Sequence, residues 1–134
     1  VMIEVGARLA GGRKGIMAQE TVPGWYPFDA MIDAHCGIPL RVPLNFSPSL
    51  VARHVYVPNN GKAGKVTSIK GADFDRLKTH NCSIVLAKVG ENVKVSRDIM
   101  SFPAFCWLVG TKEDVDADTK RAREEFIIEV EVEE

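Results

Sequence analysis

Two short apolar segments constrain the fold of this chain more than any other feature. They read CSIVLAKV at residues 82–89 and AFCWLVG at residues 104–110. Neither approaches the 18 or so apolar residues of a membrane-spanning helix, and near-continuous apolar runs of this length are typical of strands covered on both faces. We therefore expect two central strands of a sheet, with the polar stretch between them forming an exposed excursion.

The other elements are short and separated by turn residues. The glycine-rich stretch at residues 6–15 is expected to be a loop, because glycine adopts backbone conformations that other residues avoid. Residues 40–49 carry two prolines and are expected to be a connector. Further strands are expected at residues 1–5, 50–57 and 65–71, and a helix of about two turns at residues 72–79.

The segment VPGWYPFDAMIDAHCGIP carries a clear helix signal. Pro27 suits the first helical turn, and Gly37 followed by Pro39 ends the helix. Asp29 and Asp33 are expected to point away from the apolar face. That face is predicted to carry Phe28, Met31, Ile32, His35 and Cys36.

The last third of the chain predicts a helix followed by a strand. Residues 111–126 have Thr111 as a candidate N-cap, acidic residues in the first turn and basic residues near the end, which match the helix dipole. Residues 127–134 alternate apolar and glutamate side chains, as expected of a half-buried edge strand. The whole order of elements predicts an α+β fold with a largely antiparallel sheet and helices packed on it.

Composition excludes several classes of function. The 134 residues are 46% hydrophobic and 26% charged with a net charge of −1, so neither nucleic acid nor an anionic membrane is an expected partner. No apolar run is long enough for a membrane span, and no secretory signal is recognised. Cys36, Cys82 and Cys106 are too widely spaced for a zinc knuckle, and we expect reduced, mostly buried thiols in a cytoplasmic protein.

The stretch EVGARLAGGR at residues 4–13 is the main candidate for chemistry. Glu4 is a plausible Mg²⁺ ligand, and Arg8 could neutralise a phosphoryl or acyl-phosphate group with its bidentate guanidinium. Gly11 and Gly12 would let backbone N–H groups approach an anion closely. Spacing alone leaves a solvated strand end as the alternative.

The segment MIEVGARLAGG resembles the last conserved strand of the ATP-grasp superfamily, which reads as an apolar strand, then E-x-N-x-R, then a glycine-rich loop. The following helix with its G-I-P exit, the KAGKVTSIKG stretch, the FPAFCWLVGTKEDVDADTKRA stretch and the final IIEVEVE are also similar to the end of that fold. The resemblance covers nearly the full chain. It is strongest to the carboxylate–amine ligase branch, which includes L-amino acid ligases and is related to biotin carboxylase.

The resemblance implies roles for individual residues. Glu4 matches the metal ligand that bridges Mg²⁺ to the phosphates of ATP, and Arg8 matches the arginine that contacts those phosphates or the acyl phosphate. Gly11 and Gly12 match the loop that lines the acceptor-substrate pocket, and Arg13 is expected to face the same pocket. Small-molecule carboxylates and amines are the implied substrates.

One position departs from the superfamily pattern. Gly6 stands where the usual asparagine ligates a second magnesium, so either one metal is held less tightly or a water takes that position.

The same resemblance implies a division of the chain. Residues 1–46 would be the end of the catalytic domain, and residues 47–134 a small C-terminal subdomain. An N-terminal and a central nucleotide-binding domain would precede residue 1, so the chain alone is expected to be inactive. A homodimer is one assembly that the resemblance leaves open.

A rival interpretation is a stand-alone, non-catalytic α+β module that binds a partner or a small anion. The remaining candidates favour structural roles. Neighbouring helical residues such as His35 and Cys36 do not face each other, and His54 has no acidic partner at metal-ligand spacing. Trp25 and Tyr26 are expected to anchor a loop, with the floor of a substrate pocket as the alternative.

Overall fold

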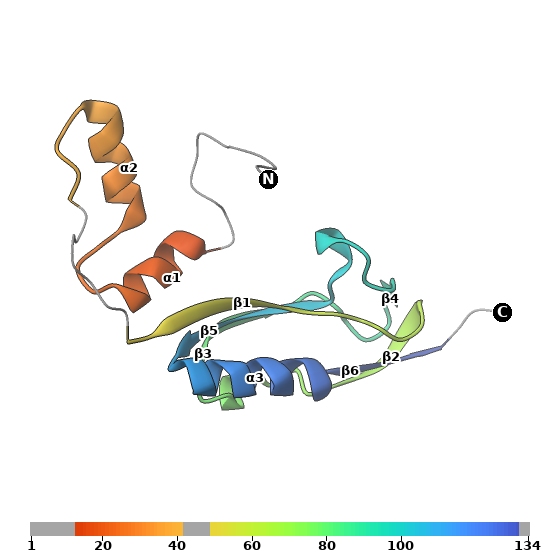
Figure 1. Ribbon diagram of the computed structural model, residues 1–134. Helices are drawn as coiled ribbons and strands as arrows, with labels where there is room; N and C mark the ends of the chain where they lie inside the picture. The colour runs from red at the N-terminus through yellow and green to blue at the C-terminus, as the bar shows by residue number, and fades with distance from the viewer. Residues whose placement is uncertain (1–12, 42–48, 132–134) are drawn as a thin grey trace, which may run out of the picture.

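The computed structural model describes residues 13–41 and 49–131 (Figure 1). Two α-helices come first, and strands with one further α-helix follow. In chain order the elements are α1 (Lys14–Thr21), α2 (Pro27–Cys36), β1 (Val51–Val57), β2 (Gly64–Lys70), the 3-10 turn η1 (Phe74–Arg76), β3 (His80–Val85), β4 (Asn92–Val93), the 3-10 turn η2 (Ile99–Ser101), β5 (Ala104–Gly110), α3 (Lys112–Glu124) and β6 (Ile127–Glu131).

The described strands form two three-stranded sheets, in the orders β1-β5-β3 and β4-β2-β6. Every pairing in both sheets is antiparallel. The predicted α+β fold with a largely antiparallel sheet is therefore confirmed, although the strands divide between two sheets. Residues 127–131 form β6 at one end of the second sheet, as the alternating pattern predicted.

Only one of the two apolar runs is a central strand. β5 lies between β1 and β3, and most of its side chains are buried. The other run forms β3, which lies at the end of its sheet and stops at Val85. Its Ile84 side chain is 48% exposed, so the prediction that this strand is covered on both faces is wrong.

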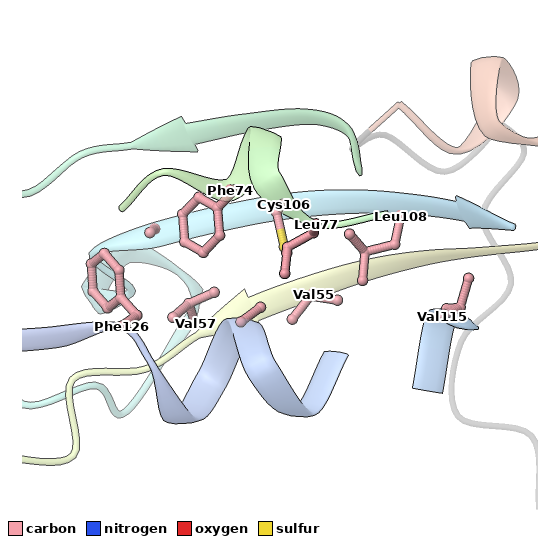
Figure 2. Close-up of a cluster of buried hydrophobic side chains, with 10 residues drawn as sticks. Val55, Val57, Phe74, Leu77, Cys106, Leu108, Val115 and Phe126 are labelled. Atoms are coloured by element: carbon pink, nitrogen blue, oxygen red, sulfur yellow. The ribbon is translucent and has the colours of Figure 1, made fainter. Parts of the chain in front are cut away.

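A single cluster of buried side chains joins the two sheets to α3 (Figure 2). Val55, Val57, Cys106 and Leu108 project from one face of the first sheet, because alternate residues of a strand point to the same side. Helix α3 lies along that face (Figure 1). The remaining members are Phe74, Leu77, Ala104, Val115, Ala122 and Phe126, with Ile69 and Ile128 of the second sheet packed against them.

Helix α3 matches its prediction closely. The side chain of Thr111 accepts a hydrogen bond from the backbone N–H of Asp114, which satisfies one of the unpaired donors at the start of the helix. Asp118, buried on the inner side of α3, accepts hydrogen bonds from the backbone N–H and the hydroxyl of Thr79, both at 2.8 Å. Those bonds tie the helix to the start of β3.

The predicted loop at residues 6–15 was wrong at its C-terminal end. Residues from Lys14 onward form α1 rather than a continuation of the glycine-rich loop. Gly15 allows this helix to approach α2, since a Cβ atom there would collide with the ring of Phe28. The glycine that suggested a loop is thus a close-packing residue inside a helix.

Helix α2 lies where it was predicted, but its buried face was predicted wrongly. Asp33 is only 1% exposed, whereas Ile32, His35 and Cys36 are exposed. Both carboxylate oxygens of Asp33 accept hydrogen bonds from the Arg41 guanidinium, at 2.7 and 2.8 Å, and this pairing lowers the pKa of Asp33. The ion pair makes burial of the carboxylate tolerable, and periodicity alone could not reveal a partner eight residues away.

Two smaller expectations also change. Residues 72–79 contain only the single 3-10 turn η1 in place of a two-turn helix. All three cysteines are free thiols, but Cys106 alone is buried, Cys82 is partly buried and Cys36 is exposed. Burial raises the pKa of Cys106 to about 12, which keeps that thiol protonated and unreactive at neutral pH.

Candidate functional site

Most of the predicted site lies outside the described residues. Glu4, Gly6, Arg8, Gly11 and Gly12 all precede residue 13, where the description begins. Their predicted roles stay predictions. Arg13 is the member of the set whose surroundings the structure defines.

Arg13 is the residue from which α1 begins. It adopts a left-handed backbone conformation with φ of 64° and ψ of 10°, the one such non-glycine residue among those described. Its guanidinium carbon lies 6.0 Å from the centre of the Trp107 ring, which is within the range of a cation–π contact. The turn into α1 therefore directs Arg13 onto the first sheet, on the face opposite α3.

We call the four rings on that side of the sheet the aromatic face: His54 and Tyr56 of β1, and Phe105 and Trp107 of β5. His54 and Trp107 are directly paired across the two strands, and their rings stack with centroids 4.5 Å apart. The His54 and Tyr56 ring centroids are 4.3 Å apart, and those of Tyr56 and Phe105 are 5.5 Å apart. The two contacts that cross from β1 to β5, His54 with Trp107 and Tyr56 with Phe105, stabilise the sheet beyond the area they bury.

His54 lies at the centre of the aromatic face, in surroundings that disfavour its protonated form. Both ring nitrogens are buried and neither has a hydrogen-bond partner. Burial lowers the pKa of His54, and the positive charge of Lys14 lowers it further. With both nitrogens sealed from solvent, this histidine is a packing residue here, as the sequence predicted.

An open pocket of about 540 Å³ is lined by residues of α1 and β1 and of the segments beside them. Lys14 and Trp25 line one side of it, and His54 lines the other. The Nε1 atom of Trp25 is buried without a hydrogen-bond partner. Trp25 thus lies in the wall of a cavity under the first helix, while the choice between loop anchor and substrate floor stays open.

Within residues 13–41 and 49–131, no group of three or more histidine, cysteine, aspartate or glutamate side chains is placed to hold a metal ion. In the same ranges, no helix is long and apolar enough to cross a membrane. The arrangement brings Arg13 to an aromatic platform at the point where the predicted nucleotide segment joins the described fold.

The fold of this chain is similar to a part of a larger solved structure. The structure is similar to that of an L-amino acid ligase from Bacillus licheniformis, with a TM-score of 0.67 and 13% sequence identity. The match covers 90% of this chain and 30% of the ligase chain. No protein-family model matches the sequence, and no curated protein matches it.

Sequence reasoning missed the cluster formed by Arg13, His54 and Trp107. Alternation within residues 51–57 separates Val55 and Val57 from His54 and Tyr56, and this signal could have assigned the two faces of the strand. The pairing of His54 with Trp107 joins residues more than fifty positions apart, so only the sheet register reveals it.

Proposed function

We propose that this chain is the C-terminal portion of an ATP-dependent carboxylate–amine, or carboxylate–thiol, ligase that works through an acyl-phosphate intermediate. The observation that carries the proposal is the structural similarity to an L-amino acid ligase over 90% of the chain. The Glu4 and Arg8 motif supports it as well, because it precedes a glycine-rich segment in the order typical of the superfamily. The chain alone is proposed to be inactive, since it spans 30% of that ligase.

In the complete enzyme, the carboxylate substrate would attack the γ-phosphorus of ATP, forming an acyl phosphate and releasing ADP. The amine would then attack the acyl carbon, releasing phosphate and losing its proton to form the amide. Glu4 would hold Mg²⁺, which neutralises phosphate charge when bound. Arg8 would stabilise charge on the transferring phosphoryl group with its two parallel N–H donors.

The acceptor side of the site would be formed by the segment just before α1. Gly11 and Gly12 would expose backbone N–H groups to the acceptor substrate, and Arg13 would lie at the edge of that pocket. Gly6 supplies no side-chain oxygen, so a second metal would need water in that position. Residues 1–46 would then belong to the catalytic domain and residues 47–134 to a C-terminal subdomain, in a cytoplasmic enzyme.

Substitution in the full-length protein tests the proposal. Glu4→Gln and Arg8→Ala should each lower ATP-dependent amide formation by at least about a hundredfold, because each removes charge complementary to the reacting phosphates. The measurement is ADP release with a panel of carboxylates and amines. Circular dichroism should show that both variants remain folded.

Matched controls come from exposed residues of the described fold. Glu20→Gln removes a carboxylate from α1, and Arg97→Ala removes an exposed guanidinium from the loop before η2, and both should leave turnover unchanged. Near-normal turnover in both the Glu4 and Arg8 variants would contradict the proposal. An upstream coding sequence without a nucleotide-binding domain would instead favour the stand-alone binding module.

A further inference from the structure

An apolar groove of about 350 Å³ lies beside the aromatic face. Phe105 and Trp107 of β5 line it together with His54 of β1. Its other walls come from the end of the first sheet and from η2, and they consist of Ile84, Leu86, Ile99 and Met100. Four large apolar side chains therefore gather around a single concavity.

These walls are unusually open to solvent. Ile84 is 48% exposed, Leu86 and Ile99 are each more than half exposed, and Met100 is 88% exposed. Scattered apolar residues on a surface are normal, but a contiguous group around a groove marks a place where another surface packs. On the opposite side of the same sheet, α3 covers equivalent apolar residues completely.

The chemistry of the groove favours a protein surface over a small polar ligand. Small-molecule sites combine apolar walls with a few accessible polar groups that orient the ligand. The polar groups of the groove side chains are the His54 imidazole, whose two ring nitrogens are buried, and the single indole N–H donor of Trp107. Hence the groove offers side-chain packing and little directional hydrogen bonding.

The position of Arg13, just before α1, bears on which protein surface could cover the groove. The Arg13 guanidinium lies over Trp107, and Trp107 lines the groove, so the first described residue reaches the side of the sheet that carries the groove. Most of the similar ligase lies outside the region that this chain matches. Under the proposed function, an upstream domain of the same polypeptide is joined to the described fold through Arg13, on this side of the first sheet.

We propose that the groove formed by Ile84, Leu86, Ile99, Met100, Phe105 and Trp107 is the docking surface for the part of the polypeptide that precedes residue 1. This inference rests on the proposed function, in which catalytic domains precede this chain. The docked surface presents apolar side chains that cover the groove and thereby hold the C-terminal subdomain against the nucleotide site.

Thiol labelling of the full-length protein tests the docking surface. Ile84→Cys places a thiol in the groove, and Ile127→Cys places one on β6, where the wild-type side chain is 49% exposed. Maleimide labelling, mapped by peptide mass spectrometry, should be at least about tenfold slower at position 84 than in the same variant unfolded in urea. Labelling at position 127 should stay within about twofold of its unfolded rate.

Fast labelling at position 84, equal to that at position 127, would overturn the docking surface. So would slow labelling that becomes fast on dilution, because that pattern assigns the cover to a second copy of the chain. Peroxide oxidation of Met100 in the unsubstituted protein gives a second measurement without a variant, with the buried Met17 as internal reference. Met100 oxidising at the rate of free methionine would count against the proposal.

These readouts are independent of turnover. If an upstream domain is present and the thiol introduced at position 84 still labels fast, the docking surface alone is overturned. Protection of that thiol, together with normal activity in the Glu4 and Arg8 variants, overturns the proposed function alone.

Discussion

The two faces of the β1-β5-β3 sheet differ in chemistry and in cover. One face presents aliphatic side chains and Cys106 to α3 and η1, and these residues are almost fully buried. The other presents the aromatic face, partly covered by α1, with open apolar walls beside it. The first face supplies the core on which the described fold depends, whereas apolar side chains beside the second face stay exposed to solvent.

The largest expected effect is a difference in the free energy of unfolding between alanine substitutions on the two faces. Leu108→Ala removes a fully buried side chain from the α3 side and should lower the free energy of unfolding by about 2–5 kcal/mol. Ile84→Ala removes a half-exposed side chain from the other side and should cost less than about 1 kcal/mol. Urea denaturation of the isolated 134-residue chain measures both values, because the proposed upstream cover of Ile84 is absent there. Equal losses of unfolding free energy in the two variants would contradict the conclusion that only the α3 side forms the core.

A polar contact on the α3 side is expected to have an intermediate effect. Asp118→Ala leaves the buried backbone N–H of Thr79 without its acceptor and should destabilise the protein by about 1–3 kcal/mol. Asp118→Asn keeps an acceptor oxygen at the same place and should recover at least half of that loss in the same denaturation assay. If the asparagine variant is as unstable as the alanine variant, the carboxylate charge matters more than the hydrogen bonds.

The smallest expected effect is a pH dependence from the aromatic face. The folded state lowers the pKa of His54 below its ordinary value of 6.5, so the folded state binds the proton less readily than the unfolded state. The contribution of neutral His54 to the free energy of unfolding is therefore fully present above about pH 6.5, and it is lost as the pH falls below that value. His54→Phe should flatten the fall in melting temperature between about pH 6.5 and pH 5.

His35→Gln is the matched control, because His35 is exposed and its Nδ1 atom contacts only the local carbonyl oxygen of Met31. That variant should keep the wild-type pH profile. A His54→Phe protein that retains the full pH dependence would show that another group carries it. The carboxylates whose pKa values are lowered by ion pairs, such as Glu129 beside Lys70, act only at lower pH.

Local sequence patterns correctly predicted the elements whose conformation depends on interactions between neighbouring residues. Helix α3 has its cap, its dipole-matched charges and its amphipathic face in one continuous segment, and it lies where expected. β6 alternates with a period of two and lies at the end of its sheet. In both cases the physical cause of the structure acts over a few neighbouring residues.

The errors occur where a distant partner changes the outcome. Gly15 lies within a helix, where its missing side chain leaves room for the ring of Phe28, and Asp33 is buried with Arg41 as its partner. The candidate site divides in the same way. The motif containing Glu4 and Arg8 can be recognised in the amino-acid sequence, whereas the stacking of His54 on Trp107 depends on the register of the two strands.

By itself, the sequence determined the α+β class and the order of most strands and helices, because these follow from periodicity, caps and local motifs. The tertiary structure decided which sheet each strand joins, which face of α2 is buried, and where Arg13 lies. Those features depend on contacts between residues far apart in the chain, whose free energies are realised only when the elements pack together.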